Sequence, residues 1–180
     1  MTREDILLQI LKVRKKYTKL KFEGDDKYNF RVSGLLEFNA THNNYKIKDS
    51  YSILLLVPKS FPEMIPAIIE TGGKIAPTFH TNMDKTLCLE APIKLYMAFN
   101  KNPTLLHFIE SCAIPFFYSH SYLQKEDKLP FGDRAHGGKG LLDMYKEYFD
   151  LKNNHAIIKF LKILAENNYK GSKVCPCSSG

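Results

Sequence analysis

The stretch "LLLVPKSFPEMIPAIIETGGKIAPTFHTNMDKTLCLEAP", Leu54–Pro92, predicts most about the fold and the chemistry of this 180-residue chain. It begins in an apolar run typical of a central β-strand, passes a proline-containing turn, and continues in a second apolar run that ends at two glycines. A polar segment follows, and in it Cys88 stands between two leucines. Cys88 is therefore either a small apolar residue entering a core or a nucleophile that the segment presents.

A helix is expected at the N-terminal end, over residues 2–17. Thr2 and Asp5 have the spacing of a capping box, and the acidic Glu4 and Asp5 suit the positive end of a helix. Apolar residues at helical spacing give the segment one apolar face, and its other face is basic.

Three segments after this helix are rich in β-forming residues and are separated by turn signals: 27–41, 46–58 and 64–73. Asn43 and Asn44 favour a tight turn between the first two segments. Because the connections are short, we expect an antiparallel meander.

The pattern changes after the glycine pair. Residues 74–100 are expected to be mostly irregular, and residues 102–124 predict a helix with Asn102 as its cap and a bend or restart at Pro115. A Gly-rich loop, "LPFGDRAHGGKG", and two helical stretches, "LLDMYKEYF" and "NNHAIIKFLKILAENN", follow. Together these segments predict one α+β domain over residues 1–168.

Composition and charge are those of an ordinary globular domain. Hydrophobic residues make up 44% and charged residues 25% of the chain, a balance that gives a core without disulfide staples. The apolar runs are too short to span a bilayer and the N-terminus lacks a signal-peptide core, so we expect a cytoplasmic protein without membrane partners. The net charge is +7, but the lysines are scattered, so nucleic acid is kept only as an alternative partner.

His80, Asn82 and Cys88 lie within nine residues and supply the residue types of cysteine-based acyl transfer. A thiolate can accept an acyl group as a thioester, and an asparagine amide can hold the oxyanion when an amine attacks that thioester. No strong base is needed, because the thioester is already activated. Asn82 is thus either an oxyanion donor or a loop-capping side chain, and His80 is interpreted as structural rather than as a general base.

This order of residues resembles the ubiquitin-conjugating enzymes, which have a His-Pro-Asn triplet shortly before a Cys that is followed by Leu. Here "HTN" precedes "LCL", and "LLLVPKSFPEMIPAIIE" is similar to the strand, proline-rich turn and strand of that family. The resemblance implies the family's α+β fold, with an N-terminal helix, an antiparallel β-meander, an active-site loop and C-terminal helices. It also implies a cis Phe61–Pro62 peptide bond. In order of elements it covers roughly residues 2–150, and its specific motifs lie within residues 52–90.

The closer similarity is to bacterial E2-like proteins of antiphage operons, of the CBASS or Bil type. It rests on "FPEMIPAIIETGGKI", on "TLCLEAP", and on "PFFYSHSY" followed by "LPFGDRAHGGKGLLDMYKEY". The resemblance implies that Cys88 carries the C-terminal glycine of a ubiquitin-like protein, or of a cyclic-oligonucleotide synthase (CD-NTase), as a thioester. The acyl group would pass to an acceptor protein. A separate activating enzyme would be a further partner, docking on the basic face of the first helix.

Three departures separate the chain from the eukaryotic enzymes. Thr81 replaces the middle proline of the triplet, and Asn82 lies closer to Cys88 in sequence, so Asn82 need not reach the usual oxyanion position. The segment "LPFGDRAHGG" has no counterpart in those enzymes. It would bring Arg134 or His136 beside Cys88 as a substitute or supplementary polar group.

The other cysteines are interpreted differently. Cys112 has apolar neighbours at helical spacing and is expected to be a buried core thiol. Cys175 and Cys177, in "CPCSSG", resemble the opening of a SEC-C zinc motif and are half of the four-ligand set that a structural zinc needs. The resemblance implies that residues 169–180 are a linker and the truncated start of a zinc-binding tail. We therefore expect no cofactor, and zinc only in a longer chain.

Two alternatives use the same cysteine. One is a catalytically inactive binding module of the same fold, which the presence of Cys88 disfavours. The other is a cysteine hydrolase in which Cys88 acts with His136 and Asp133. The hydrolase requires His136 within hydrogen-bond reach of the thiol.

Overall fold

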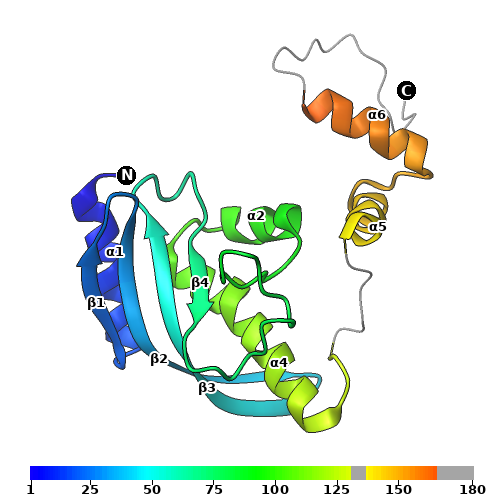
Figure 1. Cartoon of the computed structure of the whole chain (residues 1–180). Coiled ribbons are helices and arrows are strands. Elements are labelled where there is room, and N and C mark those ends of the chain that lie inside the picture. Colours follow the sequence, from blue (N-terminus) through cyan, green and yellow to red (C-terminus); the bar gives the residue numbers. More distant parts are fainter. Residues whose placement is uncertain (131–136, 166–180) are drawn as a thin grey trace. The chain divides into compact units, whose positions relative to one another are not determined.

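The computed structural model describes residues 1–130 and 137–165, and the chain divides into two compact units, Met1–Phe131 and Gly132–Gly180. The first unit holds a four-stranded antiparallel sheet and helices that pack on it (Figure 1). The described part of the second unit holds α5 (Gly137–Phe149) and α6 (Asn154–Leu164). The fold class is α+β, as the sequence predicted.

The sheet follows the chain order β1–β2–β3–β4, and every neighbouring pair is antiparallel. Its strands are β1 (Leu20–Asp25), β2 (Asn29–His42), β3 (Tyr45–Pro58) and β4 (Ala67–Glu70). β2 and β3 pair along their whole length, and Asn43 and Asn44, with φ of 45° and 63°, form the tight turn between them. The predicted meander is confirmed, but it starts with β1, which the sequence did not single out.

The helix at the N-terminal end is α1 (Arg3–Lys16), capped as predicted. The Asp5 amide donates to Thr2 Oγ1 (3.2 Å), and the Thr2 amide donates to Asp5 Oδ2 (2.9 Å). The three basic residues of its last turn suit the negative end of the helix.

The long helical region after the cysteine loop is built from three segments: α3 (Leu105–Phe108), the π-helical turn η1 (Ile109–Ala113) and α4 (Ile114–Glu126). The predicted restart at Pro115 is confirmed, because Pro115 lies in the first turn of α4, where no amide donor is needed. The predicted cap Asn102 is wrong. Thr104 takes that place, since its hydroxyl accepts the His107 amide (3.2 Å). Cys112 is buried, as predicted.

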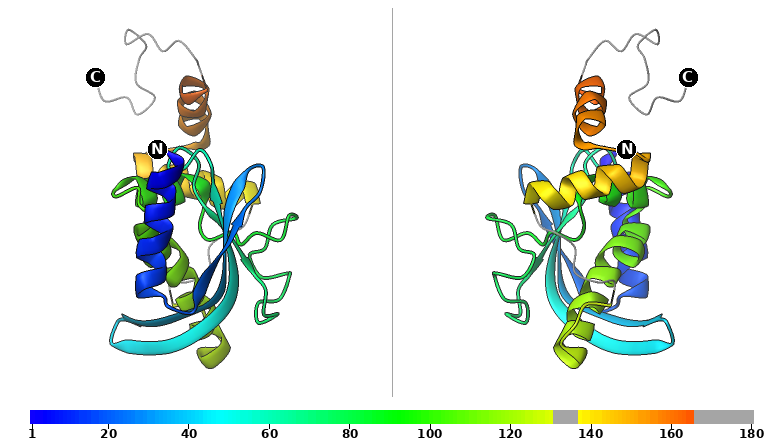
Figure 2. Two further views of the ribbon diagram at one scale, coloured as in Figure 1. Left: turned by 90° about the vertical axis from the view of Figure 1, so that its left-hand side faces the viewer. Right: turned by 90° about the vertical axis from the view of Figure 1, so that its right-hand side faces the viewer.

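α1 and α4 lie on the same side of the sheet (Figure 2). Alternate residues of β3 point into the core that these helices cover. The largest fully buried side chains come from the sheet, the turn after β3 and the helices: Tyr51, Phe30, Phe61, Phe99, Phe108 and Phe117. The Phe61–Pro62 peptide bond is cis, which confirms that expectation.

Residues 74–100 are mostly irregular, as predicted, although α2 occupies Pro92–Asn100, with Pro92 at a first-turn position that favours helix initiation. The expectation of a loop over the whole Gly-rich segment is wrong at its end. The Gly-rich segment is helical from Gly137 onward, within α5, although glycines weigh against a helix. Residues 131–136 of that segment lie outside the described part.

The second unit contains the two helices predicted near the C-terminal end. Asn153 caps α6 by accepting the Ala156 amide (3.0 Å), and Phe149 of α5 packs on Phe160 of α6 with ring centroids 4.4 Å apart. Across residues 1–130 and 137–165, no helix is both long and apolar enough to cross a membrane.

Substitution of Gly34, in β2, is expected to have a large effect on stability. The φ of Gly34 is 132°, and a Cβ atom there would lie 2.2 Å from the backbone oxygen of Lys19. We expect Gly34→Ala to lower the free energy of unfolding by about 2–4 kcal/mol, because the backbone must shift and the conformation disfavours a side chain. Urea unfolding followed by circular dichroism measures this loss.

Gly24→Ala is the matched control. Gly24 also has a positive φ (110°), but no described atom lies within 4 Å of the added Cβ. We expect it to cost only about 1–2 kcal/mol. Equal losses in the two variants would rule out the steric explanation for Gly34.

Candidate active site

Residues 80–88 form a small β-hairpin that carries the predicted site. Three backbone contacts close it: the Cys88 amide to the His80 oxygen (2.7 Å), the Thr81–Leu87 bridge, and the Asn82 amide to the Thr86 oxygen (2.8 Å). The Leu87 amide also donates to the Ile68 oxygen of β4 (2.7 Å), which ties the hairpin to the edge of the sheet. The structure therefore brings all three predicted residues of this segment onto one hairpin.

The hairpin ends in a three-residue loop, residues 83–85. The Lys85 amide donates to the Asn82 oxygen (2.9 Å), and Lys85 has φ of 68°, the left-handed conformation that commonly closes such loops. Asp84 Oδ1 accepts from the hydroxyl (2.6 Å) and the amide (3.0 Å) of Thr86. These two hydrogen bonds hold the pKa of Asp84 below its usual value, and the bond from the Thr86 hydroxyl has the larger effect. The loop is thus fixed by its own side chains.

Cys88 is presented by the alternation of side chains along the hairpin. Leu87 is buried and Leu89 packs against the core, whereas Cys88 between them is partly exposed. Because Asn82 lies opposite Thr86, and Cys88 is two residues beyond Thr86 on the same strand, the side chains of Asn82, Thr86 and Cys88 share one face of the hairpin. Of the two interpretations of Cys88, the geometry favours the presented thiol over the core residue.

The Cys88 thiol is neutral at rest. Burial first, and the Glu90 carboxylate second, raise its pKa above the ordinary value of a thiol. Its Sγ lies 3.9 Å from the Glu90 backbone oxygen, which is a weak contact for a thiol donor. A thiol with a raised pKa is also a poorer leaving group, so an acyl group bound to it resists stray attack.

Removal of the Glu90 charge is expected to change the reactivity of the Cys88 thiol measurably. Glu90→Gln removes the negative charge, which lowers the pKa of Cys88, and keeps the oxygen that accepts the Ala91 amide (2.9 Å). We expect iodoacetamide to alkylate Cys88 about 2- to 5-fold faster at about pH 8 in this variant. Peptide mass spectrometry measures the rate at Cys88 alone.

Glu63→Gln removes an exposed carboxylate in the turn after β3 and serves as the control. It should leave the alkylation rate unchanged. An equal rate in Glu90→Gln and the unmodified protein would show that Glu90 does not act on the thiol.

The Asn82 side chain is oriented by Thr86. Its Nδ2 donates to Thr86 Oγ1 (3.0 Å), while the Thr86 hydroxyl donates its only proton to Asp84. Thr86 Oγ1 must therefore accept, which fixes which end of the amide faces it. Since an amide nitrogen carries two protons, one N–H of Asn82 is left for a second acceptor. Asn82 closes the loop and retains a donor, so both of its predicted roles stay open.

His80 connects the hairpin to α4. It has φ of 43°, its carbonyl accepts the Cys88 amide, and its ring packs edge-on against Phe79 (4.7 Å) and Phe116 of α4 (6.3 Å). His80 thus belongs to the framework of the loop through its backbone and its ring. Any direct part in the chemistry stays a prediction.

The sequence did not predict that Thr86 and Asp84 belong to the site. The signal that could have found them is the Asp-x-Thr spacing, which favours an Asx turn at a hairpin tip. The sequence also missed a chain of buried polar side chains between β3 and α4, whose members lie far apart in the sequence.

The remaining predicted site residues fall outside the described part of the chain: Asp133, Arg134, His136, Cys175 and Cys177. Their parts in oxyanion binding, hydrolysis and zinc binding stay predictions. Within residues 1–130 and 137–165, no group of three or more His, Cys, Asp or Glu side chains could hold a metal ion.

Comparisons with protein-family models, with curated proteins and with solved structures gave no match for this chain. What the site does therefore follows from its residues and their geometry.

Proposed function

We propose that the protein is a ubiquitin-conjugating-like acyltransferase of a bacterial antiviral defence system. In this proposal Cys88 carries the C-terminal glycine of a ubiquitin-like protein or of a CD-NTase as a thioester. The observation that carries it is the partly exposed Cys88 thiol, held on a closed hairpin between leucines that face the core. A thiol held in one position favours acyl exchange with a protein partner, because its orientation is fixed before the encounter.

The order of elements supports the finer fold assignment. An N-terminal helix, an antiparallel meander, a cysteine-bearing loop and a helix packed on the sheet follow one another in the order of the ubiquitin-conjugating enzymes. We infer a ubiquitin-conjugating-enzyme-like fold for the unit Met1–Phe131.

The reaction divides into two acyl transfers. First, the Cys88 thiol loses its proton and the sulfur attacks the thioester carbonyl of the activated modifier, whose previous thiolate leaves and takes up a proton. Second, an amine of the acceptor attacks the Cys88 thioester, an amide bond forms, and the Cys88 thiolate leaves. The proton of the attacking nitrogen passes to solvent, and the thiol is regenerated.

The raised pKa of Cys88 supports a carrier rather than a hydrolytic nucleophile. A hydrolytic cysteine works as a thiolate that nearby positive charge stabilises. Among residues 1–130 and 137–165, the charged neighbour that acts on Cys88 is the negative Glu90, which disfavours the thiolate. A carrier tolerates this, because each transfer starts from a thioester that is already activated.

Co-expression of the chain with the products of its operon, followed by mass spectrometry of the intact protein, tests the proposal. The expected result is an added mass equal to a ubiquitin-like protein or a CD-NTase less one water, lost on treatment with a thiol reductant and mapped to Cys88. Cys112 is an internal control, because it is buried and should stay unmodified. Unmodified Cys88 in the presence of every operon product, or an adduct that resists reductant, would refute the assignment.

A further inference from the structure

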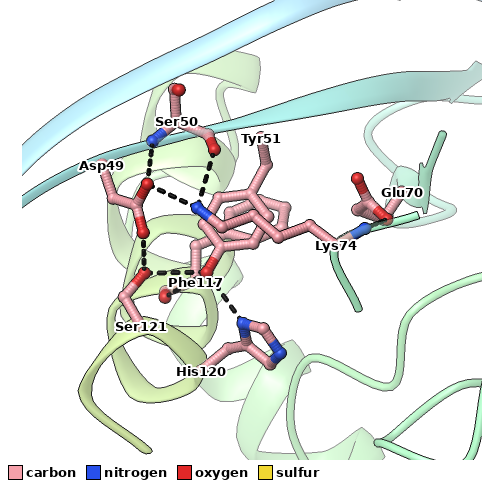
Figure 3. Close-up of polar contacts among 8 residues, drawn as sticks. All are labelled: Asp49, Ser50, Tyr51, Glu70, Lys74, Phe117, His120 and Ser121. Carbon is pink, nitrogen blue, oxygen red and sulfur yellow. Dashed lines mark hydrogen bonds and ion pairs between the residues drawn. The ribbon is translucent and has the colours of Figure 1, made fainter. Parts of the chain in front are cut away.

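A chain of buried polar side chains links β3 to α4 (Figure 3). Ser121 Oγ lies 2.6 Å from Asp49 Oδ2 and 2.7 Å from the Tyr51 hydroxyl, and that hydroxyl lies 2.8 Å from His120 Nδ1. Tyr51, His120 and Ser121 are each at most 2% exposed. At the other end Lys74 donates to Asp49, and its Nζ lies 4.2 Å from the centre of the Tyr51 ring.

Asp49 sets the direction of every hydrogen bond in this chain. Burial acts to raise the pKa of Asp49, but hydrogen bonds from Lys74 and Ser121 outweigh it and hold that pKa below its usual value. Asp49 is therefore a carboxylate, which can only accept, so Ser121 donates to it. Ser121 must then accept from Tyr51.

His120 is the last member, and its tautomer follows. Burial, with smaller contributions from nearby carboxylates, raises the pKa of Tyr51 to about 12 despite the hydrogen bond to Ser121. Tyr51 is thus not ionised. Its hydroxyl donates to Ser121, with a longer contact to the Phe117 carbonyl oxygen (3.5 Å), and accepts from His120. The proton of neutral His120 therefore lies on Nδ1.

The His120 ring also supports the loop that carries Cys88. Phe79 packs edge-on against it with ring centroids 5.0 Å apart, and the next residue, His80, accepts the Cys88 amide. Phe79 contacts Phe116 of α4 as well (5.9 Å). Because these rings are in direct contact, a rotation of His120 would displace Phe79 and, through the His80 carbonyl, the hairpin.

We propose that His120 is a positioning residue for Cys88, held in one tautomer and one orientation by the Asp49–Ser121–Tyr51 chain and acting through Phe79. His120 need not touch substrate in this arrangement. The inference rests on the proposed function only for its consequence in acyl transfer, since the position of the Cys88 hairpin can be measured without any modifier.

Acid should release this support. Burial, and then the positive Lys74, lower the pKa of His120 from 6.5, while Asp49 and Glu70 act in the opposite direction. Tyr51 is a further titratable group in direct contact with the His120 ring. The stability that neutral His120 contributes is full above about pH 6.5 and is lost as the pH falls toward the lowered pKa, because the unfolded chain binds the proton first.

Amide hydrogen exchange of Cys88, followed by NMR, tests the proposal. The Cys88 amide reports directly on the hairpin, because it donates to the His80 oxygen. We expect Ser121→Ala and His120→Leu to speed its exchange by about tenfold while the amide of Leu55 in β3 is unaffected. His120→Asn keeps a donor close to the place of Nδ1, so it should restore most of the protection.

Ser119→Ala is the matched control for Ser121→Ala. The Ser119 hydroxyl donates to the Pro115 carbonyl within α4 (2.9 Å), outside the chain of buried side chains. Ser119→Ala should therefore leave hydrogen exchange of the Cys88 amide unchanged. If His120→Leu does not fold, the two serine variants give the same comparison.

A long-range proton–nitrogen NMR spectrum measures the tautomer of His120. This tautomer should not depend on Tyr51 if His120 only fills space in the core. We expect His120 to show the Nδ1–H tautomer, and Tyr51→Phe to abolish that preference. Unchanged Cys88 exchange in Ser121→Ala and Tyr51→Phe, or an equal increase at every amide, would overturn the positioning role. Normal hairpin exchange with no adduct on Cys88 would instead count against the proposed function alone.

Discussion

Cys88→Ala is expected to abolish the reductant-sensitive adduct completely and to leave the fold intact. The sulfur is the only atom of this side chain that can hold an acyl group, so no residual thioester should form. Because the side chain is partly exposed and outside the core, its loss should change the free energy of unfolding by less than about 1 kcal/mol. Intact-mass spectrometry and urea unfolding measure the two effects.

Cys112→Ala gives the opposite pattern and is the matched control. Cys112 is 6% exposed within the core, so its truncation should cost about 1–2 kcal/mol of stability and leave the adduct in place. Cys88→Ser adds a third comparison, because an ester on serine survives reductant and is cleaved by base. An adduct on Cys88→Ala would mean that another residue is the nucleophile. A loss of stability equal to that of Cys112→Ala would mean that Cys88 is a core residue.

The parts of the fold that the sequence predicted are those with local causes. The capping box of Thr2 and Asp5 fixes the start of α1 within one turn, and Asn43 and Asn44 fix the register of the β2–β3 hairpin. Pro115 restarts a helix for a reason that lies in its own ring. In each case the deciding residues are neighbours in the chain, so one sequence suffices.

The parts that the sequence missed depend on partners far along the chain. β1 (Leu20–Asp25) has an irregularity in its register near Gly24, which weakens its strand pattern, and only pairing with β2 makes it a strand. Ser121 and Asp49 are separated by 72 positions, and nothing near either residue indicates the other. A buried polar chain of this kind can be recognised only when the packing of α4 on β3 is known.

The candidate site falls between these two cases. The flanking leucines left Cys88 as either a core residue or a presented nucleophile, and the resemblance of the neighbouring segments to conjugating enzymes favoured the second. The environment of Asn82 could not be predicted, because it depends on the hairpin register that places Asn82 opposite Thr86 rather than opposite Cys88. That register also places Asn82 on the same face of the hairpin as Cys88.

Asn82→Ala is expected to slow transfer from a preformed Cys88 thioester to an amine by about 10²- to 10³-fold, the usual cost of losing one oxyanion donor. Formation of the thioester should change by less than about threefold, since binding and the thiol are untouched. Thr86→Val keeps the shape of Thr86 but removes the hydroxyl that orients the amide, so an intermediate loss of about tenfold is expected. Single-turnover discharge to free lysine measures each rate.

Asn39→Ala, at an exposed position of β2, is the control and should discharge at the unmodified rate. The decisive comparison is between discharge and the hydrogen exchange of the Cys88 amide. If Asn82→Ala slows discharge while that exchange is unchanged, the amide acts on the oxyanion, because the hairpin has kept its position. If discharge falls only in proportion to a loss of protection at Cys88, Asn82 closes the loop and the oxyanion donor must be sought elsewhere. Arg134→Ala and His136→Ala would then be the next variants, because the segment that contains them is the predicted substitute for the altered triplet.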